Sequence, residues 1–403
     1  MLNPAIPKRP LALVLSGGGA RGAYEAGVLS YLFEEILPIW KGKVELDIAS
    51  GTSVGAIHAA YTLATRGTDS KSRASILIEA WESMRASQIL RLRFKDLLGL
   101  PLRALGLRSS NEKLTLGGLV DLSKLDKLIA DRIPWTQLEK VLKNEHLGLC
   151  VSCTEIRSGR VVVFMSGGLA NPDVWLDDPN ARAEHCTITT EHVRASAAIP
   201  FLFPAVRIGK RYYVDGGLRM NTPLSPALRL GAQRALVVCL RHPPPTHTNA
   251  PPYPEAVIKS PSFVLGKILN ALTLDQLEYE LKRLDLINEM ISQGELHYGS
   301  DFLDKINIAV KQKRGRGYSQ VETQILRPSE DLGKIAGESI QGAGKEMGTL
   351  TNLLAKLAAH NPGKEADLLS YLLFDRVYTK RLIELGRSDA KLRHDEIREL
   401  LEP

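Results

Sequence analysis

One serine of this chain lies in a sequence typical of an enzymatic nucleophile. Ser53 is the centre of Gly51-Thr52-Ser53-Val54-Gly55, which has the form G-x-S-x-G. Glycines two residues before and after a serine leave room for a sharp, strained turn from a strand into a helix. Such a turn exposes the hydroxyl at a helix N-terminus, where the helix dipole favours developing negative charge. Ser53 is therefore the candidate nucleophile.

A second glycine-rich turn precedes this serine in the chain. It consists of Gly17, Gly18, Gly19, Ala20, Arg21 and Gly22. Because it has the form G-x-G-x-x-G, this turn could hold the pyrophosphate of a dinucleotide. Dinucleotide binding, however, also requires an acidic residue at the end of the second strand to bind the ribose. The sequence there reads Ala49-Ser50-Gly51. A nucleotide-binding module remains the alternative that the glycines alone allow.

The same turn also fits an oxyanion hole. Loops that follow neighbouring strands of a parallel sheet lie at one edge of that sheet, so we expect this turn beside Ser53. Free N–H groups of Gly18, Gly19 and Ala20 would then point at the carbonyl oxygen of an ester under attack. Each donor of this kind lowers the barrier by about 3–4 kcal/mol. Arg21 would add positive charge there, or form a salt bridge at the surface of the helix start.

A serine nucleophile needs a base, and the histidines do not supply a convincing one. Of the nine histidines, His58 lies inside the helix expected after the nucleophile and would face along that helix. The other eight have no motif-like setting. Asp215 differs from them, because it follows the strand-like run Arg211–Val214 and precedes Gly216 and Gly217. Its carboxylate is either the base or the aspartate of an Asx-type turn.

Two strand–turn–helix units would position these residues. Leu11–Leu15 is a continuous apolar run of the kind found in buried parallel strands, and Ala23–Leu37 has apolar residues at helical spacing. Val44–Ser50 then predicts a second strand, and Val54–Gly67 predicts the helix after it. Consecutive units of this kind indicate an α/β fold with a parallel sheet.

Further elements are predicted along the rest of the chain. The additional strands are Leu147–Ile156, Arg160–Ser166, a hairpin at Gly209-Lys210, Arg234–Leu240, Lys305–Val310 and Val321–Leu326. Arg241–Pro254 contains six prolines and predicts an exposed loop. A long amphipathic helix is expected from about Val264 to Gln293, and helices follow to the C-terminus. The basic segment Lys311–Gly317 predicts a solvated loop, and no nucleic-acid partner is expected.

A distinctive basic segment lies between the two halves of the predicted sheet. Residues 76–110 are expected to be helical, and 85–108 combine apolar and basic side chains. This stretch would either contact an anionic membrane, with leucines at the acyl boundary and arginines at the headgroups, or pack on the sheet with a solvated basic face. The formal net charge of +7 and the pI near 9.1 agree with either.

Composition limits the class of protein. A chain of 403 residues with 44% apolar and 24% charged residues is long enough for one large domain or two, and wholesale disorder is excluded. Four cysteines are too few for a disulfide framework and suggest a reducing compartment. Cys150 and Cys153 lie three apart on a predicted strand, so they would face opposite sides and could not share a metal. Without a signal-peptide pattern or a transmembrane run, a cytoplasmic location is expected.

Jointly, the three glycine motifs resemble those of the patatin-like phospholipase family. Gly17–Gly22 is similar to the family's G-G-G-x-[RK]-G, Gly51–Gly55 to its G-x-S-x-G and Asp215–Gly217 to its D-G-[GA]. The likeness extends along most of the chain. It includes the stretches Arg194–Val206, Asn221–Ala232, Ile325–Gly333 and Ser370–Ala390.

The resemblance implies both a fold and an activity. The fold would be a three-layer α/β/α sandwich around a mainly parallel sheet, and the activity would be hydrolysis of phospholipid or other fatty-acyl esters without a metal or another cofactor. Asp215 would take the Ser53 proton and return it to the leaving alcohol. Acyl transfer to an acceptor other than water would use the same dyad. A scaffold with a relic site is disfavoured, because the serine, the aspartate and the glycines are all present. His58 departs from the family, in which many members carry a small polar residue such as Asn.

The same resemblance gives an expected domain organisation. Residues 1–242 would form the catalytic core, 243–262 a proline-rich loop, 263–330 a helix and late strands that complete the core, and 331–403 a C-terminal helical extension.

Overall fold

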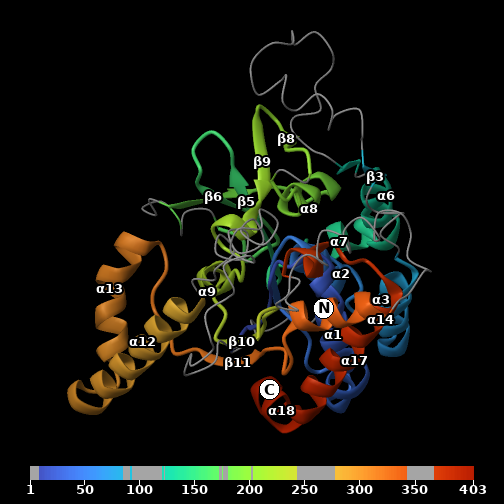
Figure 1. The fold of residues 1–403 in the computed structure, drawn as a ribbon. Helices are drawn as coiled ribbons and strands as arrows, with labels where there is room; N and C mark the ends of the chain where they lie inside the picture. The colour runs from blue at the N-terminus through green and yellow to red at the C-terminus, as the bar shows by residue number, and fades with distance from the viewer. Residues whose placement is uncertain are drawn as a thin grey trace, which may run out of the picture.

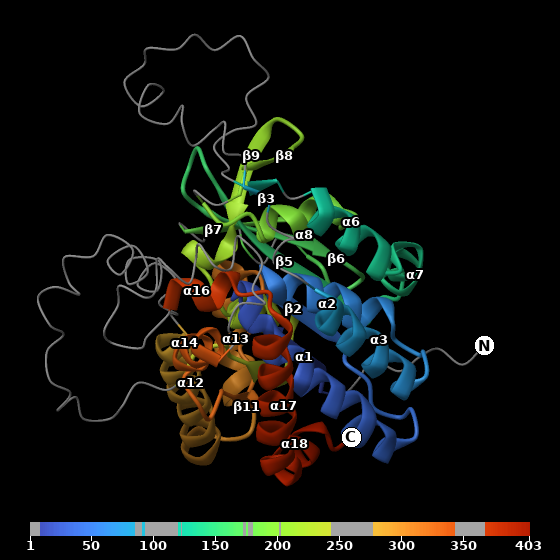
Figure 2. The same ribbon diagram turned by 45° about the vertical axis from the view of Figure 1, so that its right-hand side comes forward.

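A nine-stranded, mainly parallel sheet forms the centre of the computed structural model (Figures 1 and 2). The structure describes residues 9–84, 91–92, 120–121, 123–171, 175, 180–200, 203–242, 277–342 and 367–403. The strands of the sheet are β1 (Leu11–Leu15), β2 (Ile48–Thr52), β5 (Gly148–Glu155), β6 (Val161–Ser166), β7 (Ala181–His185), β8 (Val206–Ile208), β9 (Arg211–Asp215), β10 (Arg234–Val238) and β11 (Glu322–Leu326).

The strand order is β11-β10-β1-β2-β5-β6-β7. From β11 to β5 all neighbours are parallel, as the strand–turn–helix units predict. The direction changes at β5, to which both β6 and β9 are antiparallel, and β8 pairs only with β9. A separate antiparallel pair consists of β3 (Arg91–Leu92) and β4 (Val120–Asp121).

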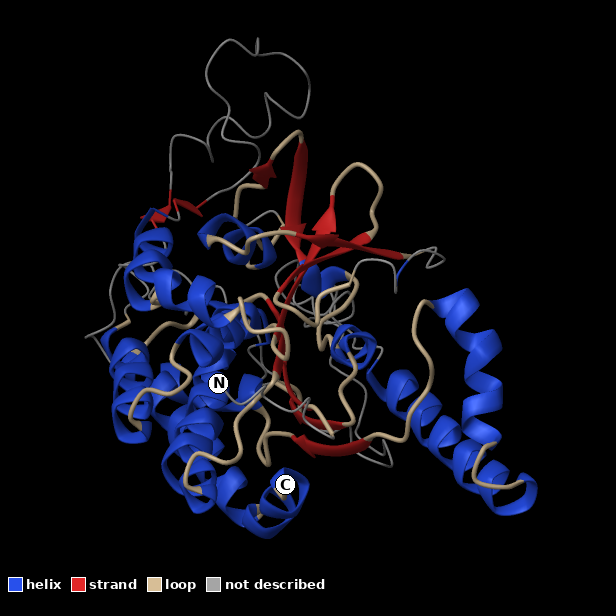
Figure 3. Cartoon of the chain, turned by 180° about the vertical axis from the view of Figure 1, so that it is seen from behind, coloured by secondary structure: helices blue, strands red, loops and turns tan. Residues whose placement is uncertain are grey.

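Helices cover both faces of the sheet, which gives three layers (Figure 3). The described helices are α1 (Gly22–Tyr31), α2 (Val54–Ala64), α3 (Ser70–Ser83), α6 (Ser123–Arg132), α7 (Trp135–Val141), α8 (Thr190–Ser196), α9 (Leu224–Leu230), α12 (Leu277–Tyr298), α13 (Phe302–Arg314), α14 (Leu332–Gly342), α16 (Asp367–Leu372), α17 (Arg376–Leu392) and α18 (His394–Leu401). Short 3-10 turns (η1, Gly19–Arg21; η3, Leu37–Trp40; η5, Gly216–Leu218) and a π turn (η2, Leu32–Ile36) extend them.

The central strand β1 shows how the layers form. Its five residues are completely buried, and alternate side chains point to opposite faces of the sheet. Leu11, Leu13 and Leu15 join the larger core, with α1, α2, α3 and α17. Ala12 and Val14 join the smaller core, with α9 and the start of α12. A strand buried on both faces must be apolar throughout, which is why its sequence shows no alternation.

One predicted strand is wrong. Lys305–Val310 lies within helix α13, which also contains most of the basic segment that was expected to be a loop. A short apolar run cannot be assigned to strand or helix from periodicity alone, and the good helix formers after it allow the helix to continue. The Asn307 side chain fixes the arrangement by exchanging two hydrogen bonds with the backbone of Tyr318. Gly315, with φ of 76°, ends the helix.

The continuous helix expected over 76–110 is also wrong. α3 ends at Ser83, Met84 is extended with ψ of 138°, and Arg91–Leu92 is a strand. The physical reason is visible in Leu90–Lys95, where apolar and basic residues alternate with the period of a strand. Most of 85–108 lies outside the described residues, as does the proline-rich stretch from 243 onward.

Other boundaries differ by a few residues. β2 begins at Ile48 where Val44 was expected. Helix α12 spans Leu277–Tyr298 and continues past the predicted end at Gln293, while its predicted start near Val264 lies outside the described residues. Strand β7 was not predicted from the sequence. No helix in the described ranges is long and apolar enough to cross a bilayer.

Candidate active site

Strand β5 brings the candidate serine and aspartate together. One edge of β5 pairs with β6, so β2 and β9 share the other edge. Thr52, the last residue of β2, pairs with Ser152, and Asp215, the last residue of β9, pairs with Cys153. Two strand ends that approach from opposite directions therefore lie beside consecutive residues of β5. Ser53, which directly follows β2, therefore lies next to Asp215 at the end of β9.

The turn that carries Ser53 is strained, and only glycine fits at its flanks. Ser53 has φ of 55° and ψ of −122°, in a region that residues with a side chain rarely adopt. A Cβ atom on Gly51 would lie 2.2 Å from the carbonyl oxygen of Gly55. A Cβ on Gly55 would lie 2.3 Å from the carbonyl oxygen of Leu15. The predicted strained strand-to-helix turn at Ser53 is thus present, and both glycines are sterically required.

A serine that the sequence did not single out supports the strained turn. The backbone N–H of Ser53 donates to Ser196 Oγ at 2.8 Å, and that hydroxyl donates to the carbonyl oxygen of Ser152 at 2.6 Å. Ser196 ends helix α8 and is completely buried. It satisfies the amide of the turn and ties it to β5, although nothing in its local sequence distinguishes it from other helical serines.

The candidate base is buried, and burial changes its acidity. Asp215 is 6% exposed and Ser53 is 3% exposed. Burial raises the pKa of Asp215 from 3.8 to about 6, while hydrogen bonds from the Ser53 side chain and the Gly217 backbone partly oppose this rise. The Gly217 N–H donates to Asp215 Oδ1 at 2.7 Å. Gly216 is required as well, because its Cβ would lie 2.2 Å from the Ser152 carbonyl oxygen.

The glycine-rich turn lies beside Ser53, as expected. A Cβ on Gly17 would approach the Cβ of Ser53 to 3.2 Å and the Oδ1 of Asn221 to 2.7 Å. Asn221 holds the turn through two bonds: its main-chain carbonyl oxygen accepts from the Gly17 N–H at 3.0 Å, and its side-chain Nδ2 donates to the Gly17 carbonyl oxygen at 3.2 Å. Asn221 also adjoins Gly217, so it links the first glycine motif to the aspartate motif. Asn221 was not among the site residues predicted from the motifs.

The next residues of this turn have distinct environments. In the described part of the chain the N–H groups of Gly18 and Gly19 donate to no protein acceptor. Gly19 adopts φ of 56°, and a Cβ there would lie 2.4 Å from the Tyr371 carbonyl oxygen. Ala20 is completely buried in η1. Gly22 lets α1 approach α2, because its Cβ would lie 2.4 Å from the Val54 side chain.

Arg21 contacts the C-terminal part of the chain. Its Nε donates to Ser370 Oγ at 2.8 Å, and its guanidinium lies 4.1 Å from the ring centroid of Tyr371. The residue is only 5% exposed, so its side chain is buried and does not lie on the surface of the helix start. Arg21 thus fixes helix α16 beside the glycine-rich turn.

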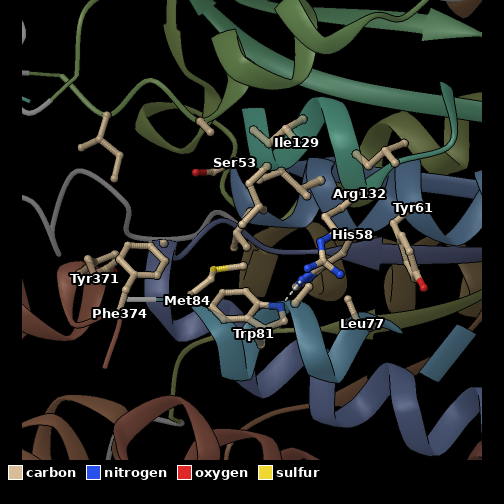
Figure 4. A pocket seen from close by; sticks show the side chains of 18 of the residues that line it. Ser53, His58, Tyr61, Leu77, Trp81, Met84, Ile129, Arg132, Tyr371 and Phe374 are labelled. Atoms are coloured by element: carbon tan, nitrogen blue, oxygen red, sulfur yellow. Dashed lines mark hydrogen bonds between the residues drawn. The ribbon is translucent and has the colours of Figure 1, made fainter. Parts of the chain in front are cut away.

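An apolar pocket begins at Ser53 and continues along helix α2 (Figure 4). We call it the apolar pocket and define it by its lining residues. These are Gly19, Ser53, Val54, Ile57, His58, Tyr61, Ile76, Leu77, Ala80, Trp81, Met84, Leu128, Ile129, Arg132, Ile133, Ala197, Ile199, Phe203, Tyr371 and Phe374. They come from α2, α3, α6, the segment after α8 and the C-terminal region. The sequence did not predict this convergence.

His58 does not act as the base of Ser53, which agrees with the sequence analysis. Both of its ring nitrogens have other partners, Glu25 at 2.8 Å and Trp81 at 3.0 Å. Burial lowers the pKa of His58 to about 3. Cys150 and Cys153 point into opposite cores, and the described residues contain no cluster of three His, Cys, Asp or Glu side chains that could hold a metal.

Related sequences cover part of the chain. An uncharacterized NTE family protein of Mycobacterium tuberculosis is 27% identical over 219 residues, which is 54% of this chain and 28% of that protein. An uncharacterized NTE family protein of Mycobacterium bovis is 28% identical over the same length. The match therefore covers little more than a quarter of each relative's own length.

Two solved structures overlap with the chain at low similarity. Human GIVD cytosolic phospholipase A2, in complex with methyl gamma-linolenyl fluorophosphonate, aligns with 98% of this chain and 58% of its own, at 11% identity and a TM-score of 0.38. VipD from Legionella pneumophila aligns with 94% of this chain and 67% of its own, at 13% identity and a TM-score of 0.31.

The family model described as patatin-like phospholipase matches residues 13–228, more than half of the chain. The matched range includes both glycine-rich turns and the aspartate motif. On this match, the chain belongs to the patatin-like phospholipase family.

Proposed function

We propose that the protein hydrolyses fatty-acyl esters of lipids through a Ser53–Asp215 dyad. The observation that carries this proposal is the position of Ser53. It lies in a strained turn, its side chain lowers the pKa of the buried Asp215 carboxylate, and it forms one end of an apolar pocket. Such a pocket suits an acyl chain, since burial of apolar surface stabilises binding by roughly 0.8 kcal/mol for each methylene group.

The reaction would proceed in two steps. The Ser53 hydroxyl attacks the ester carbonyl carbon while the Asp215 carboxylate takes its proton. The resulting oxyanion accepts hydrogen bonds from the free N–H groups of Gly18 and Gly19. When the carbon–oxygen bond to the alcohol breaks, Asp215 returns the proton to the departing alcohol. Water, deprotonated by the same carboxylate, then attacks the carbonyl carbon of the acyl-enzyme. When the bond to Ser53 Oγ breaks, Asp215 returns the proton to that oxygen, and the fatty acid and the Ser53 hydroxyl are released.

The proposal extends to the parts of the chain that work with the site and to the protein's location in the cell. The core of 1–242 would work together with the late strand β11 and the C-terminal helices, since Tyr371 and Phe374 line the apolar pocket. We also propose a cytoplasmic location with peripheral contact between 85–108 and an anionic membrane. Co-sedimentation with anionic vesicles at low salt tests this contact, and no binding would contradict it.

The catalytic proposal is tested with p-nitrophenyl esters of graded chain length. We expect Ser53→Ala to reduce kcat by at least about a thousandfold and Asp215→Ala by at least about a hundredfold, in protein with an unchanged circular dichroism spectrum. A wild-type rate in Ser53→Ala would refute the nucleophile. A wild-type rate in Asp215→Ala alone would refute the base.

A further inference from the structure

Three buried side chains form a hydrogen-bonded chain behind one wall of the apolar pocket. Glu25, His58 and Trp81 come from α1, α2 and α3. The Nδ1 of His58 lies 2.8 Å from Glu25 Oε2, and the Trp81 indole N–H donates to His58 Nε2 at 3.0 Å (Figure 4). All three residues are at most 3% exposed. A buried indole N–H needs an acceptor, and here His58 supplies it.

The donor and the acceptor can be assigned in both hydrogen bonds of the Glu25–His58–Trp81 trio. An indole nitrogen can only donate, so His58 Nε2 must be the unprotonated nitrogen of the ring. A neutral imidazole then carries its proton on Nδ1, which donates to Glu25. Burial lowers the pKa of His58 to about 3, so this arrangement persists across the physiological pH range. The hydrogen bonds that link Glu25, His58 and Trp81 therefore hold Trp81 in a fixed position.

Trp81 is also held on its other sides. Its ring stacks on Phe374, with centroids 6.3 Å apart and an interplanar angle of 15°. Its edge lies against α1, where a Cβ on Gly22 would come within 3.0 Å of Cζ2. With the hydrogen bond to His58, these contacts fix the orientation of an indole that lines the pocket together with His58 and Phe374.

The position of this wall along the pocket follows from helix geometry. His58 lies five positions after Ser53, which corresponds to about 7.5 Å along α2. An extended alkyl chain, with bonds of about 1.5 Å and angles near 111°, advances about 1.25 Å per carbon. An acyl chain attached to Ser53 would therefore reach His58 and Trp81 at about its sixth carbon.

We propose that Trp81, oriented by His58, is the residue that makes the site prefer acyl chains longer than about six carbons. The proposal rests on the function proposed above. Longer chains would bury their distal methylene groups against the indole, whereas a butyryl chain would end before it. His58 is a positioning residue that acts through Trp81, and Glu25 fixes its tautomer.

Two substitutions of His58 separate its two hydrogen bonds. In His58→Gln the amide oxygen reaches the position of Nε2 and can accept from Trp81. In His58→Asn the shorter amide reaches only the position of Nδ1, so the contact with Glu25 remains and the acceptor for Trp81 is lost. Trp81→Phe removes the donor, and Trp175→Phe is a control because Trp175 lies in the core on the opposite face of the sheet.

The measurement is the ratio of kcat/KM for octanoyl and butyryl p-nitrophenyl esters. We expect this ratio to fall about tenfold in His58→Asn and Trp81→Phe, mainly through KM for the octanoyl ester. It should stay within about twofold of wild type in His58→Gln and Trp175→Phe. We also expect the wild-type ratio to be constant between pH 5.5 and 8.5, while the rates themselves follow the ionisation of Asp215.

Three results would overturn the inference. These are an unchanged ratio in Trp81→Phe, equal ratios in the asparagine and glutamine variants of His58, and a wild-type ratio that shifts with pH. Trp81→Phe keeps the test decisive if His58→Asn fails to fold. Failure of the proposed function looks different, since wild-type protein would then hydrolyse no ester of either length.

Discussion

Asp215 is expected to make the folded protein less stable as it ionises. Its carboxyl is buried, and burial raises its pKa from 3.8 to about 6. In the unfolded chain the same group titrates near 3.9. Between these two values the folded state keeps the proton and the unfolded state has lost it. The free energy of unfolding must therefore fall as the pH rises through this window.

The size of the effect follows from the two pKa values. A separation of about 2 units corresponds to roughly 3 kcal/mol, because each unit is worth about 1.4 kcal/mol. Asp215→Asn removes the titration, while its amide oxygen can still accept from the Gly217 N–H. At pH 4 the unfolded carboxyl is already about half ionised, so the asparagine variant should gain roughly 2.5 kcal/mol relative to wild type between pH 4 and pH 8.

Urea denaturation of both proteins at pH 4 and pH 8 measures this gain. Asp304→Asn is the control, because Asp304 is exposed on α13 and far from the site in the fold. If the stability difference between Asp215→Asn and wild type is the same at both pH values, burial does not raise the pKa of Asp215 and the reasoning fails. The same pKa requires kcat/KM to rise with pH and level off above about 6, since the base must be ionised.

Two further predictions concern the backbone around Ser53. Gly55→Ala should lower the free energy of unfolding by more than about 3 kcal/mol, because the new Cβ would lie 2.3 Å from the Leu15 carbonyl oxygen. Thermal denaturation measures this loss, and a Tm within 2–4 °C of wild type would contradict it. Asn221→Ala should reduce kcat about tenfold, because it removes the hydrogen bond from Nδ2 to the Gly17 carbonyl oxygen and loosens that turn. Asn307→Ala removes two hydrogen bonds between a side chain and the backbone on α13, at least as many as Asn221→Ala removes, and should leave kcat unchanged. Equal losses of kcat in both variants would contradict a local role for Asn221.

The sequence alone determined the features that depend on neighbouring residues. The G-x-S-x-G turn was predictable because the clash that Gly51 avoids is with Gly55, four residues away. The parallel strand–turn–helix units were predictable because continuous apolar runs and helical spacing are local patterns. The two wrong predictions also come from local patterns. Within six residues, Lys305–Val310 and Leu90–Lys95 each fit both the helical and the strand spacing of apolar residues, and tertiary packing decides which one forms.

Only the tertiary structure determined which distant residues support the candidate site. Ser196 accepts a hydrogen bond from the Ser53 N–H, although the two residues are 143 positions apart in the sequence. Asn221 holds the turn at Gly17 from 204 positions away. Asp215 was a candidate from its motif, but its nearness to Ser53 depends on β2 and β9 sharing one edge of β5. Strand order and pairing register arise from the collective burial of two cores, and no local pattern encodes them. The acidity of Asp215 likewise comes from the whole fold, because it is set by burial.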